Sequence, residues 1–444
     1  MREVGSQEER EVGASMHKVI SLYTGAGGLD LGLEAAGFTT SVAVEFNAAA
    51  CRTLRANAGD ARPWCVIERD IHEVPSDELA RRAGLAGDRP PALLVGGPPC
   101  QPFSKAAYWV HGDTKRLDDP RADTLTAYLR VLRDLRPQAF LLENVFGLTY
   151  KGKDEALKLL QRTINKINTE VGTRYSFNWQ VLNCADYGVP QVRERFFLVG
   201  ARDGREFRFP NATHYDADRE VGESGNVGAN GAPFQVGLFA DAPASRVLKP
   251  WTTAWDAIGD LSEGDHEALR VTGKWGDLLP SIPEGQNYLW HTNRGGGLQL
   301  FGWRRRFWSF LLKLAKNRPS WTIQAQPGAG VGPLHWKSRR LSVHEMMRIQ
   351  TFPDGYRIEG GHTEATRQLG NAVPSLMTEI LGRAIREQLL DDPVGDERLK
   401  LLPPRRTPVP PPEPVADVPT KYLVHIGNHA AHPGTGRGHL VYGT

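Results

Sequence analysis

The sequence predicts an α/β protein in which a doubly wound, Rossmann-like sheet domain is joined to a second, smaller irregular domain. Short apolar runs alternate with stretches of helical spacing from residue 18 to residue 200, which is the rhythm of an open α/β sheet. This rhythm stops after residue 204, where Gly, Pro and aromatic residues become frequent. Helical spacing then returns between residues 337 and 390.

The apolar runs predict strands because each is short, rich in aliphatic residues and bounded by polar or turn-forming residues. They cover residues 19–23, 41–45, 64–68, 92–96, 139–143, 179–183 and 196–200. Apolar residues at helical spacing predict helices over residues 29–36, 48–57, 124–135 and 155–167. In the returning segment helices are expected over residues 342–350 and 374–390, the latter opened by Pro374 in its first turn.

A chain of 444 residues is too long for one compact core, so we expect domains and tails. Residues 403–419 contain eight prolines in seventeen positions, which predicts a stiff linker followed by a disordered or loosely docked tail. The expected parts are a disordered N-terminal segment (1–17), the sheet domain (18–204), the second domain (205–336), a segment that returns to the sheet domain (337–390), and the linker with its tail (391–444).

Composition is that of a soluble globular protein, since 40% of the residues are hydrophobic and 24% are charged. No run approaches the roughly 20 apolar residues of a membrane span, and the N-terminus lacks the apolar stretch of a signal peptide. We therefore expect a cytoplasmic protein without membrane contact. Cys51, Cys65, Cys100 and Cys184 show no CxxC spacing, so we expect free thiols and no metal site.

An acid-free window covers residues 285–344. It contains no Asp or Glu, but ten Lys and Arg residues and five tryptophans. Such a stretch favours a polyanionic partner, because clustered cations and aromatic faces both suit nucleic acid. The alternative is a solvated basic face whose tryptophans fill a local core, since a basic patch alone is weak support for nucleic-acid binding.

A glycine-rich turn follows the first predicted strand in VISLYTGAGGLDLG, and it allows a ligand to approach backbone N–H groups at a helix N-terminus. Alone, the turn is equally compatible with an ordinary βα connection. Glu45 follows the second strand, where a carboxylate can accept hydrogen bonds from ribose hydroxyls, and Phe46 offers a face for adenine. Asp70 and Ile71 follow the third strand and can meet the adenine edge. No Walker lysine follows the turn, so the set favours an adenosine over a nucleoside triphosphate.

The stretch VGGPPCQPFS places Cys100 behind glycines and prolines, directly after the fourth strand. Prolines fix the backbone, and glycines let a partner approach closely. This predicts a positioned nucleophile, whereas inert packing fits the other three cysteines better.

These motifs and others resemble, in order and spacing, the DNA (cytosine-5) methyltransferases of bacterial restriction-modification systems. The resemblance covers residues 18–390 and is carried by LYTGAGGLDLG, VEFN, RDI, GGPPCQPFS, LLENVFGL, QVRERFFLVG, RRLSVHEMMRIQTFPDGY and RQLGNAVPSLM. It implies a Rossmann-like catalytic and cofactor-binding domain with a separate target-recognition domain, S-adenosyl-L-methionine as methyl donor, and double-stranded DNA as substrate. The tail after residue 391 lies outside the resemblance.

The resemblance also implies roles for individual side chains. Cys100 adds to carbon 6 of a cytosine, since a thiolate can activate the poorly nucleophilic carbon 5. Glu143 supplies a proton or hydrogen bond to ring nitrogen 3. Arg193 and Arg195 alternate at the start of a strand, so both are expected to face the same way, hold the base's carbonyl oxygen and steady Glu143. A surface charge pair is the alternative for these arginines.

Cofactor and DNA contacts are expected as follows. The cofactor-binding residues are Tyr23, Gly25, Gly27, Gly28, Leu29, Glu45, Phe46, Asp70, Ile71, Pro98, Asn371 and Val373, although Asn371 is also compatible with a helix cap. The DNA-binding residues are Ser104, Lys105, Arg304, Arg305, Arg306, Thr322 and Ile323. A stacked base is out of reach, so the cytosine must swing out of the duplex into the site.

Three other functions are weighed. A transfer-RNA cytosine-5 methyltransferase shares most of these blocks, but the basic, tryptophan-rich window favours DNA. A catalytically silent DNA-binding regulator would not need the intact set of Cys100, Glu143, Arg193 and Arg195, and a small-molecule methyltransferase would not need a second domain of this charge. We expect a monomer, and the sequence leaves open whether a cognate restriction endonuclease accompanies it.

Overall fold

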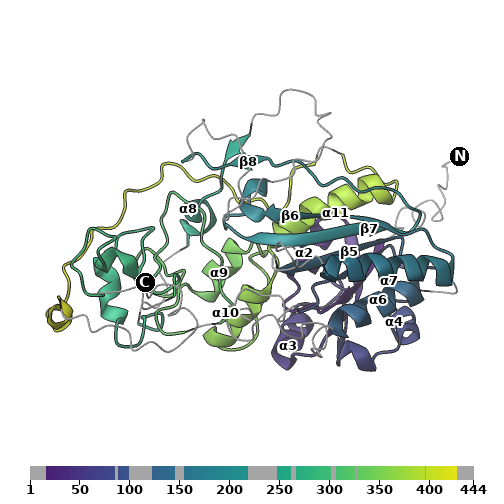
Figure 1. Cartoon of the computed structure of the whole chain (residues 1–444), viewed down its shortest axis with the longest axis horizontal. Coiled ribbons are helices and arrows are strands. Elements are labelled where there is room, and N and C mark those ends of the chain that lie inside the picture. The colour runs from purple at the N-terminus through teal and green to yellow at the C-terminus, as the bar shows by residue number, and fades with distance from the viewer. Residues whose placement is uncertain are drawn as a thin grey trace, which may run out of the picture.

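A seven-stranded sheet lies at the centre of the computed structural model, in the order β3-β2-β1-β4-β5-β7-β6 (Figure 1). The structure describes residues 17–85, 89–99, 123–145, 155–218, 248–261, 267–301, 307–326, 328–395 and 397–427. The strands are β1 (His17–Leu22), β2 (Phe38–Glu45), β3 (Cys65–Glu68), β4 (Leu93–Gly96), β5 (Ala139–Val145), β6 (Ser176–Asn183) and β7 (Glu194–Ala201). Each expected run overlaps one of them, which confirms the strand predictions.

Strand direction brings the chemical motifs to one edge of the sheet. The strands β1 to β5 are parallel to their neighbours, so their carboxyl ends share an edge. The strand β7 is antiparallel to β5 and β6, and its first residues therefore lie beside the carboxyl end of β5. In this register Arg195 pairs with Val145, and Glu143 pairs with Phe197.

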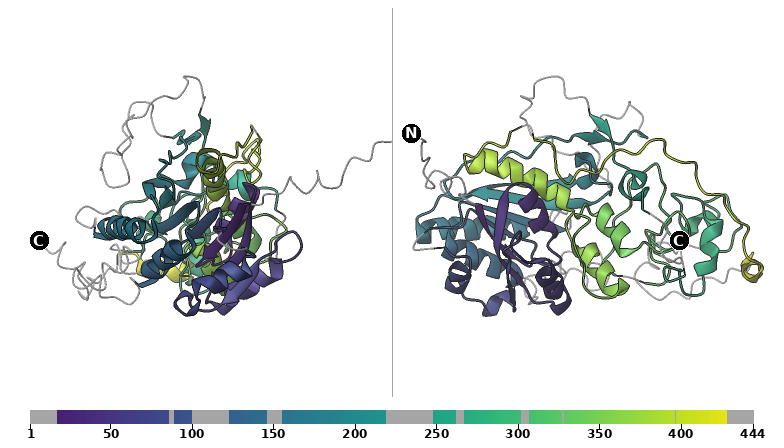
Figure 2. Two further views of the ribbon diagram at one scale, coloured as in Figure 1. Left: turned by 90° about the vertical axis from the view of Figure 1, so that its right-hand side faces the viewer. Right: turned by 180° about the vertical axis from the view of Figure 1, so that it is seen from behind.

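Helices cover both faces of the sheet, as a doubly wound fold requires (Figures 1 and 2). Apolar residues of α4 (Ser76–Arg82), α6 (Asp123–Leu135) and α7 (Glu155–Val171) join one core with the strands. On the other face, α2 (Gly28–Ala35) and α11 (Ser375–Leu389) share a second core with the same strands. The helix α11 passes so close to α2 that a Cβ at Gly32 would lie 2.2 Å from the carbonyl oxygen of Ser375. The helix α11 therefore packs on the sheet domain.

Three further helices lie between the sheet and the irregular part of the chain. They are α3 (Ala48–Asn57), α9 (Val343–Ile349) and α10 (His362–Asn371). The first two were expected from their apolar spacing, whereas α10 was not. Asn371 ends α10, while Pro374 precedes α11 as its N-cap residue, so the alternative that Asn371 caps the start of the last helix is wrong.

The irregular region forms a lobe with its own apolar core, and we call residues 267–334 the second lobe. Its core contains Leu278, Ile282, Tyr288 and Leu311. Regular structure near it is short, as expected: α8 (Ala254–Ile258), the 3-10 helices η6 (Gly276–Ser281) and η7 (Tyr288–His291), and the two-residue strands β8 (His214–Tyr215) and β9 (Lys249–Pro250). The domain boundaries drawn from the sequence remain a prediction.

The predicted linker at residues 403–419 is described by the structure, whereas residues 428–444 of the predicted tail lie outside the described residues. Residues 397–427 follow the surface from α11 to the far side of the second lobe and end in the 3-10 helix η8 (Thr420–His425), as Figures 1 and 2 show in yellow. Tyr422 is buried there, with 2% of its surface exposed. Among the helices of the described segments, none combines the length and hydropathy needed to traverse a bilayer.

Candidate active site

The turn after β4 leads to Cys100, which itself lies outside the described residues. The two residues before it are fixed by hydrogen bonds: Asn144 Nδ2 donates to the carbonyl oxygen of Pro98 at 3.1 Å, and Thr124 Oγ1 donates to that of Pro99 at 3.3 Å. Asn144 was not singled out from the sequence, although it stands in the LLENV block. The approach to residue 100 is therefore positioned by both β5 and α6.

Glu143 lies directly against this turn. A Cβ at Gly97 would come within 2.9 Å of its Oε2, so only glycine lets the turn and the carboxyl group pack together. Burial raises the pKa of Glu143, and the positive charges of Arg195 and Arg193 oppose part of that rise. A carboxyl group in this setting can keep a proton at a higher pH than an exposed glutamate can.

The two arginines of the QVRER block separate in the structure. Arg195 Nε lies 3.0 Å from Glu143 Oε1, so this pair forms as expected. Arg193 is 0% exposed, and its guanidinium donates instead to the backbone carbonyl oxygens of Gly370 and Ala372, at 2.7 and 2.9 Å, and of Ile323 at 3.2 Å. The expected fork of both arginines on the base is therefore corrected: Arg193 joins three segments of the backbone behind the site, and Arg195 alone faces Glu143.

Two of the other cysteines, Cys51 and Cys184, are poor nucleophiles. Burial raises the pKa of Cys51 and of Cys184 to about 12 each, so both thiols stay protonated at neutral pH. The thiols of Cys51, Cys65 and Cys184 are free, as expected. Within the described ranges, His, Cys, Asp and Glu side chains form no group of three that could bind a metal ion.

The predicted nucleoside site lies at the carboxyl ends of β1 and β2, and we call it the cradle. Glu45 accepts hydrogen bonds from the backbone N–H groups of Gly25, Phe46 and Asn47, at 2.8 to 2.9 Å. These three bonds fix the carboxylate at the strand end and leave only part of its acceptor capacity for a ligand. A Cβ at Gly25 would meet nothing within 4 Å, so space is open beside this turn. Phe46 is 68% exposed, as a ring that stacks on a ligand would be.

The other residues predicted to bind the cofactor differ in their exposure. Asp70 is 56% exposed and accepts from the backbone N–H of His72, which lowers its pKa. Ile71, Leu29 and Val373 are buried, so they shape the site from within the core. Asn371 is exposed at the end of α10. These positions fit an adenosine-bearing cofactor, because an exposed ring, an open turn and an exposed acid meet at one sheet edge.

Two strained or crowded positions hold the cradle in shape. Tyr23 adopts a φ of +55°, in the left-handed region that residues with a side chain rarely occupy, and its hydroxyl donates to the carbonyl oxygen of Thr124 at 2.7 Å. At Gly28 a Cβ would lie 2.4 Å from the carbonyl oxygen of Val373. This close approach connects the glycine-rich turn to the GNAV block, which joins α10 to α11.

The segment with Thr322 and Ile323 lies beside the QVRER block. The Val192 N–H donates to Ser320 O at 2.8 Å, and the hydroxyl of Thr322 donates to Val192 O at 2.8 Å. The neighbouring Trp321 is 41% exposed and packs edge-on against Trp308, which is 50% exposed. Both tryptophans belong to the acid-free window.

The acid-free window does not form a uniform basic face. Lys316 and Arg339 are buried and pair with Glu284 and Glu345, respectively. Lys313 is also buried, and burial lowers its pKa to about 8. Trp336 is 3% exposed and fills a core, whereas Trp308 and Trp321 do not. The local-core interpretation therefore holds for Trp336, and the nucleic-acid interpretation stays a prediction. Arg304, Arg305 and Arg306 lie outside the described residues.

A doubly wound sheet with a glycine-rich turn and strand-end acids at one edge fits the Rossmann-like class of enzymes that bind a nucleoside cofactor. The model of the protein family described as "C-5 cytosine-specific DNA methylase" matches residues 17–387 of this chain. The chain belongs to this family, and it is a DNA cytosine-5 methyltransferase with S-adenosyl-L-methionine as methyl donor.

Curated relatives cover nearly the same part of the chain. The type II methyltransferase M.SacI of Streptomyces achromogenes is 38% identical over 416 residues, which cover 86% of this chain and 98% of that protein. M.NgoFVII of Neisseria gonorrhoeae is 32% identical, with 80% of this chain and 83% of the relative covered. These relatives are consistent with a role in restriction-modification.

Solved structures support the fold. A putative DNA modification methyltransferase encoded within an E. coli prophage superposes with a TM-score of 0.52 at 21% identity, covering 85% of this chain and 100% of its own. The S. pombe Dnmt2 methyltransferase has a TM-score of 0.51 at 16% identity, covering 85% and 99%.

Proposed function

We propose that this enzyme methylates carbon 5 of a flipped-out cytosine within a specific sequence of duplex DNA, through a covalent adduct with Cys100. The observation that carries the proposal is the position of Glu143. A buried carboxyl group with a raised pKa lies against Gly97, in the turn that leads to Cys100, and Arg195 steadies it at 3.0 Å. Addition of a thiolate to a pyrimidine needs an acid of this kind near the nucleophile.

The residues act in a fixed order. The thiolate of Cys100 bonds to carbon 6 while Glu143 gives a proton or hydrogen bond to nitrogen 3, so that electron density collects at carbon 5. S-adenosyl-L-methionine supplies the methyl group that carbon 5 accepts. Water removes the proton of carbon 5, the carbon 5–carbon 6 double bond re-forms, and the thiolate of Cys100 departs. The products are 5-methylcytosine and S-adenosylhomocysteine.

The residues of the cradle are proposed to hold the cofactor by its nucleoside. Glu45 offers its remaining acceptor capacity to the ribose, Phe46 stacks on the adenine, and Asp70 meets the adenine edge. The backbone at Tyr23, Gly25 and Pro98 lines the same edge of the sheet. Asn371 closes it from the end of α10.

On the DNA side, Thr322 is proposed to place the target strand beside Arg195. The expectation that Ile323 contacts DNA is corrected, because Ile323 is 2% exposed and packs in a core beneath Thr322. Ser104, Lys105, Arg304, Arg305 and Arg306 are proposed to contact phosphates, in keeping with their charge or hydroxyl groups. We further propose that the enzyme acts as a cytoplasmic monomer, and that a restriction endonuclease of the same specificity accompanies it.

Trapping the covalent intermediate tests this function. A duplex with 5-fluorocytosine at the target cannot lose the substituent of carbon 5, so the adduct should persist when the methyl donor is present. Bisulfite sequencing of host DNA that carries the gene first identifies the target site. Peptide mapping should then locate the DNA on Cys100. Absence of any adduct on a duplex that the enzyme does methylate would refute the mechanism, and methylation of transfer RNA in place of DNA would refute the proposed substrate.

A further inference from the structure

The C-terminal strap, which we define as residues 397–427, begins on the catalytic domain. Glu379 of α11 is 0% exposed, and it accepts the backbone N–H groups of Lys400 and Leu401 at 2.7 and 2.9 Å. Arg383 donates to the carbonyl oxygens of Glu397 and Arg398, at 2.6 and 3.0 Å. A buried carboxylate is costly unless it is hydrogen-bonded, so these bonds fix the start of the strap firmly.

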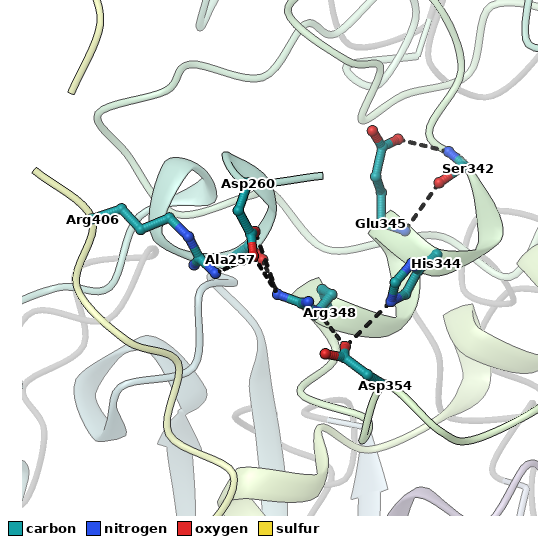
Figure 3. A network of polar contacts seen from close by, with 8 residues as sticks. All are labelled: Ala257, Asp260, Ser342, His344, Glu345, Arg348, Asp354 and Arg406. Atoms are coloured by element: carbon teal, nitrogen blue, oxygen red, sulfur yellow. Dashed lines mark hydrogen bonds and ion pairs between the residues drawn. The ribbon is translucent and has the colours of Figure 1, made fainter. Parts of the chain in front are cut away.

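The middle of the strap joins the ion-pair network shown in Figure 3. Arg406 Nη2 pairs with Asp260 at 2.7 Å, and its backbone N–H donates at 2.8 Å to Asp256, which is 2% exposed. Asp260 also lies 3.4 Å from Arg348 of α9, which in turn pairs with Asp354. The strap is thus connected to α8 and, through Asp260, to the helix that packs beside the catalytic domain.

A third group of contacts ties the strap to the second lobe. The buried Lys316 donates to Glu284 at 2.7 Å, to Glu413 at 2.9 Å and to the carbonyl oxygen of Pro411 at 3.0 Å. The backbone N–H of Glu413 donates to Glu284 at 2.8 Å, and that of Ala416 donates to Pro280 at 3.1 Å. The buried Lys316 thus lies between two carboxylates, Glu284 of the lobe and Glu413 of the strap, and joins them.

Tyr422 anchors the end of the strap inside the lobe. Its ring stacks on Trp275 at 5.1 Å with an interplanar angle of 17°, and its hydroxyl donates to the carbonyl oxygen of Lys274 at 2.8 Å. The apolar core of the second lobe includes it together with Leu278 and Phe301. An integral part of this core therefore comes from beyond residue 387, where the family match ends.

We propose that the C-terminal strap positions the second lobe for target recognition, and the proposal rests on the function proposed above. The lobe already meets the catalytic sheet through the pairing of Ser320 with Val192. A lobe joined along one side can rotate about that side, since modest interfaces between domains permit relative motion. The strap is a second connection, from α11 to Tyr422, and it restricts this rotation. It thereby keeps Thr322 and Trp321 at a fixed position relative to Arg195. The residues of the strap are positioning residues, because they act through the lobe.

Cutting the strap in the folded enzyme tests this proposal. A protease recognition sequence inserted between Val409 and Pro410, where the chain is exposed, allows cleavage after purification. The uncut enzyme is the matched control, and the cut fragment still carries Tyr422. We expect cleavage to raise the KM for cognate DNA about tenfold, which is in the range of a typical coupling between two sites. The ratio of kcat/KM for cognate DNA to kcat/KM for DNA with one changed base should fall. The affinity for S-adenosylmethionine and the kcat at saturating DNA should stay within about twofold.

Two results would overturn the proposal. One is an unchanged DNA KM and selectivity after complete cleavage, and the other is a parallel loss of cofactor affinity, which would indicate general destabilisation. A pair of variants at Tyr422 tests the anchor of the strap while the chain stays uncut. Tyr422→Ala should reproduce the rise in KM for DNA, while Tyr422→Phe, which keeps the stacked ring, should resemble the wild type. If the uncut enzyme methylates no DNA, the proposed function fails instead, so the two failures are distinguishable.

Discussion

The catalytic sheet and the second lobe become ordered by different means. The sheet is built from continuous apolar strands such as β4 and β5, each buried between two helical layers. The lobe has few regular elements and depends on aromatic stacking, on buried ion pairs such as Lys316 with Glu284, and on a segment about a hundred residues further along the chain. The sheet therefore supplies rigid positions for chemistry, while the lobe is ordered by specific polar and long-range contacts.

This difference separates the two tasks of the enzyme. Groups that react must be held to within fractions of an ångström, and the ends of paired strands provide that. Residues that select a DNA sequence must vary between related enzymes, and an irregular lobe can change without disturbing the sheet. The predictions below test this separation, beginning with the largest effect.

The first prediction concerns the sheet edge itself. Cys100→Ala should lower methyl transfer by about 10⁴-fold or more, because the variant lacks the thiolate that is proposed to add to carbon 6. Transfer of tritiated methyl groups to a cognate duplex measures the rate, and calorimetry measures cofactor affinity, which should be unchanged. Cys184→Ala is the control for loss of a thiol, and it should retain turnover. Substantial activity in the Cys100 variant would break the link between the turn and the chemistry.

The second prediction uses the raised pKa of Glu143. A protonated carboxyl group persists to higher pH when its pKa is raised, so the part of the rate that depends on it should fall as the pH rises through the raised value. Glu143→Gln cannot titrate, and it should lower kcat by about 10²-fold and remove this alkaline fall. A pH profile of kcat for both enzymes checks the sign. An alkaline fall that survives in the variant would assign it to another group.

Much of the sheet and its site could be predicted from the sequence because both depend on local signals. Apolar runs located the strands, and Glu45 and Glu143 follow from their places at strand ends. The different contacts of Arg193 and Arg195 could not be predicted. Their alternation at the start of β7 does not reveal that the backbone at Ile323 and at Gly370, in the last turn of α10, supplies carbonyl acceptors for Arg193. The strap was missed for a similar reason: its proline content predicts an extended chain, but not what the chain contacts.

The third prediction tests whether Arg193 is structural while Arg195 is chemical. Arg193→Met removes the donor from three buried backbone carbonyl groups, so we expect the free energy of unfolding to fall by about 3 kcal/mol. Arg195 lies beside Glu143, and 14% of its side chain is exposed. Arg195→Met should therefore mainly lower kcat. Urea unfolding and steady-state kinetics on both variants separate the two roles. Equal losses of stability would contradict the assignment.

The last prediction concerns the exposed tryptophan pair of the second lobe. Trp321 is 41% exposed and is adjacent in sequence to Thr322, whose hydroxyl donates to the carbonyl oxygen of Val192. We expect the exposed ring of Trp321 to contribute to DNA binding. Trp321→Ala should weaken binding of the cognate duplex about tenfold, the loss of one stacked base contact, without changing cofactor affinity. Trp179 on the edge strand β6 is the matched control. Its ring is similarly exposed, at 43%, but it belongs to the sheet, where it stacks on Phe196. Fluorescence anisotropy of a labelled duplex measures both. If Trp179→Ala weakens binding as much as Trp321→Ala, the recognition surface extends over the sheet as well as the lobe, and the separation of tasks does not hold.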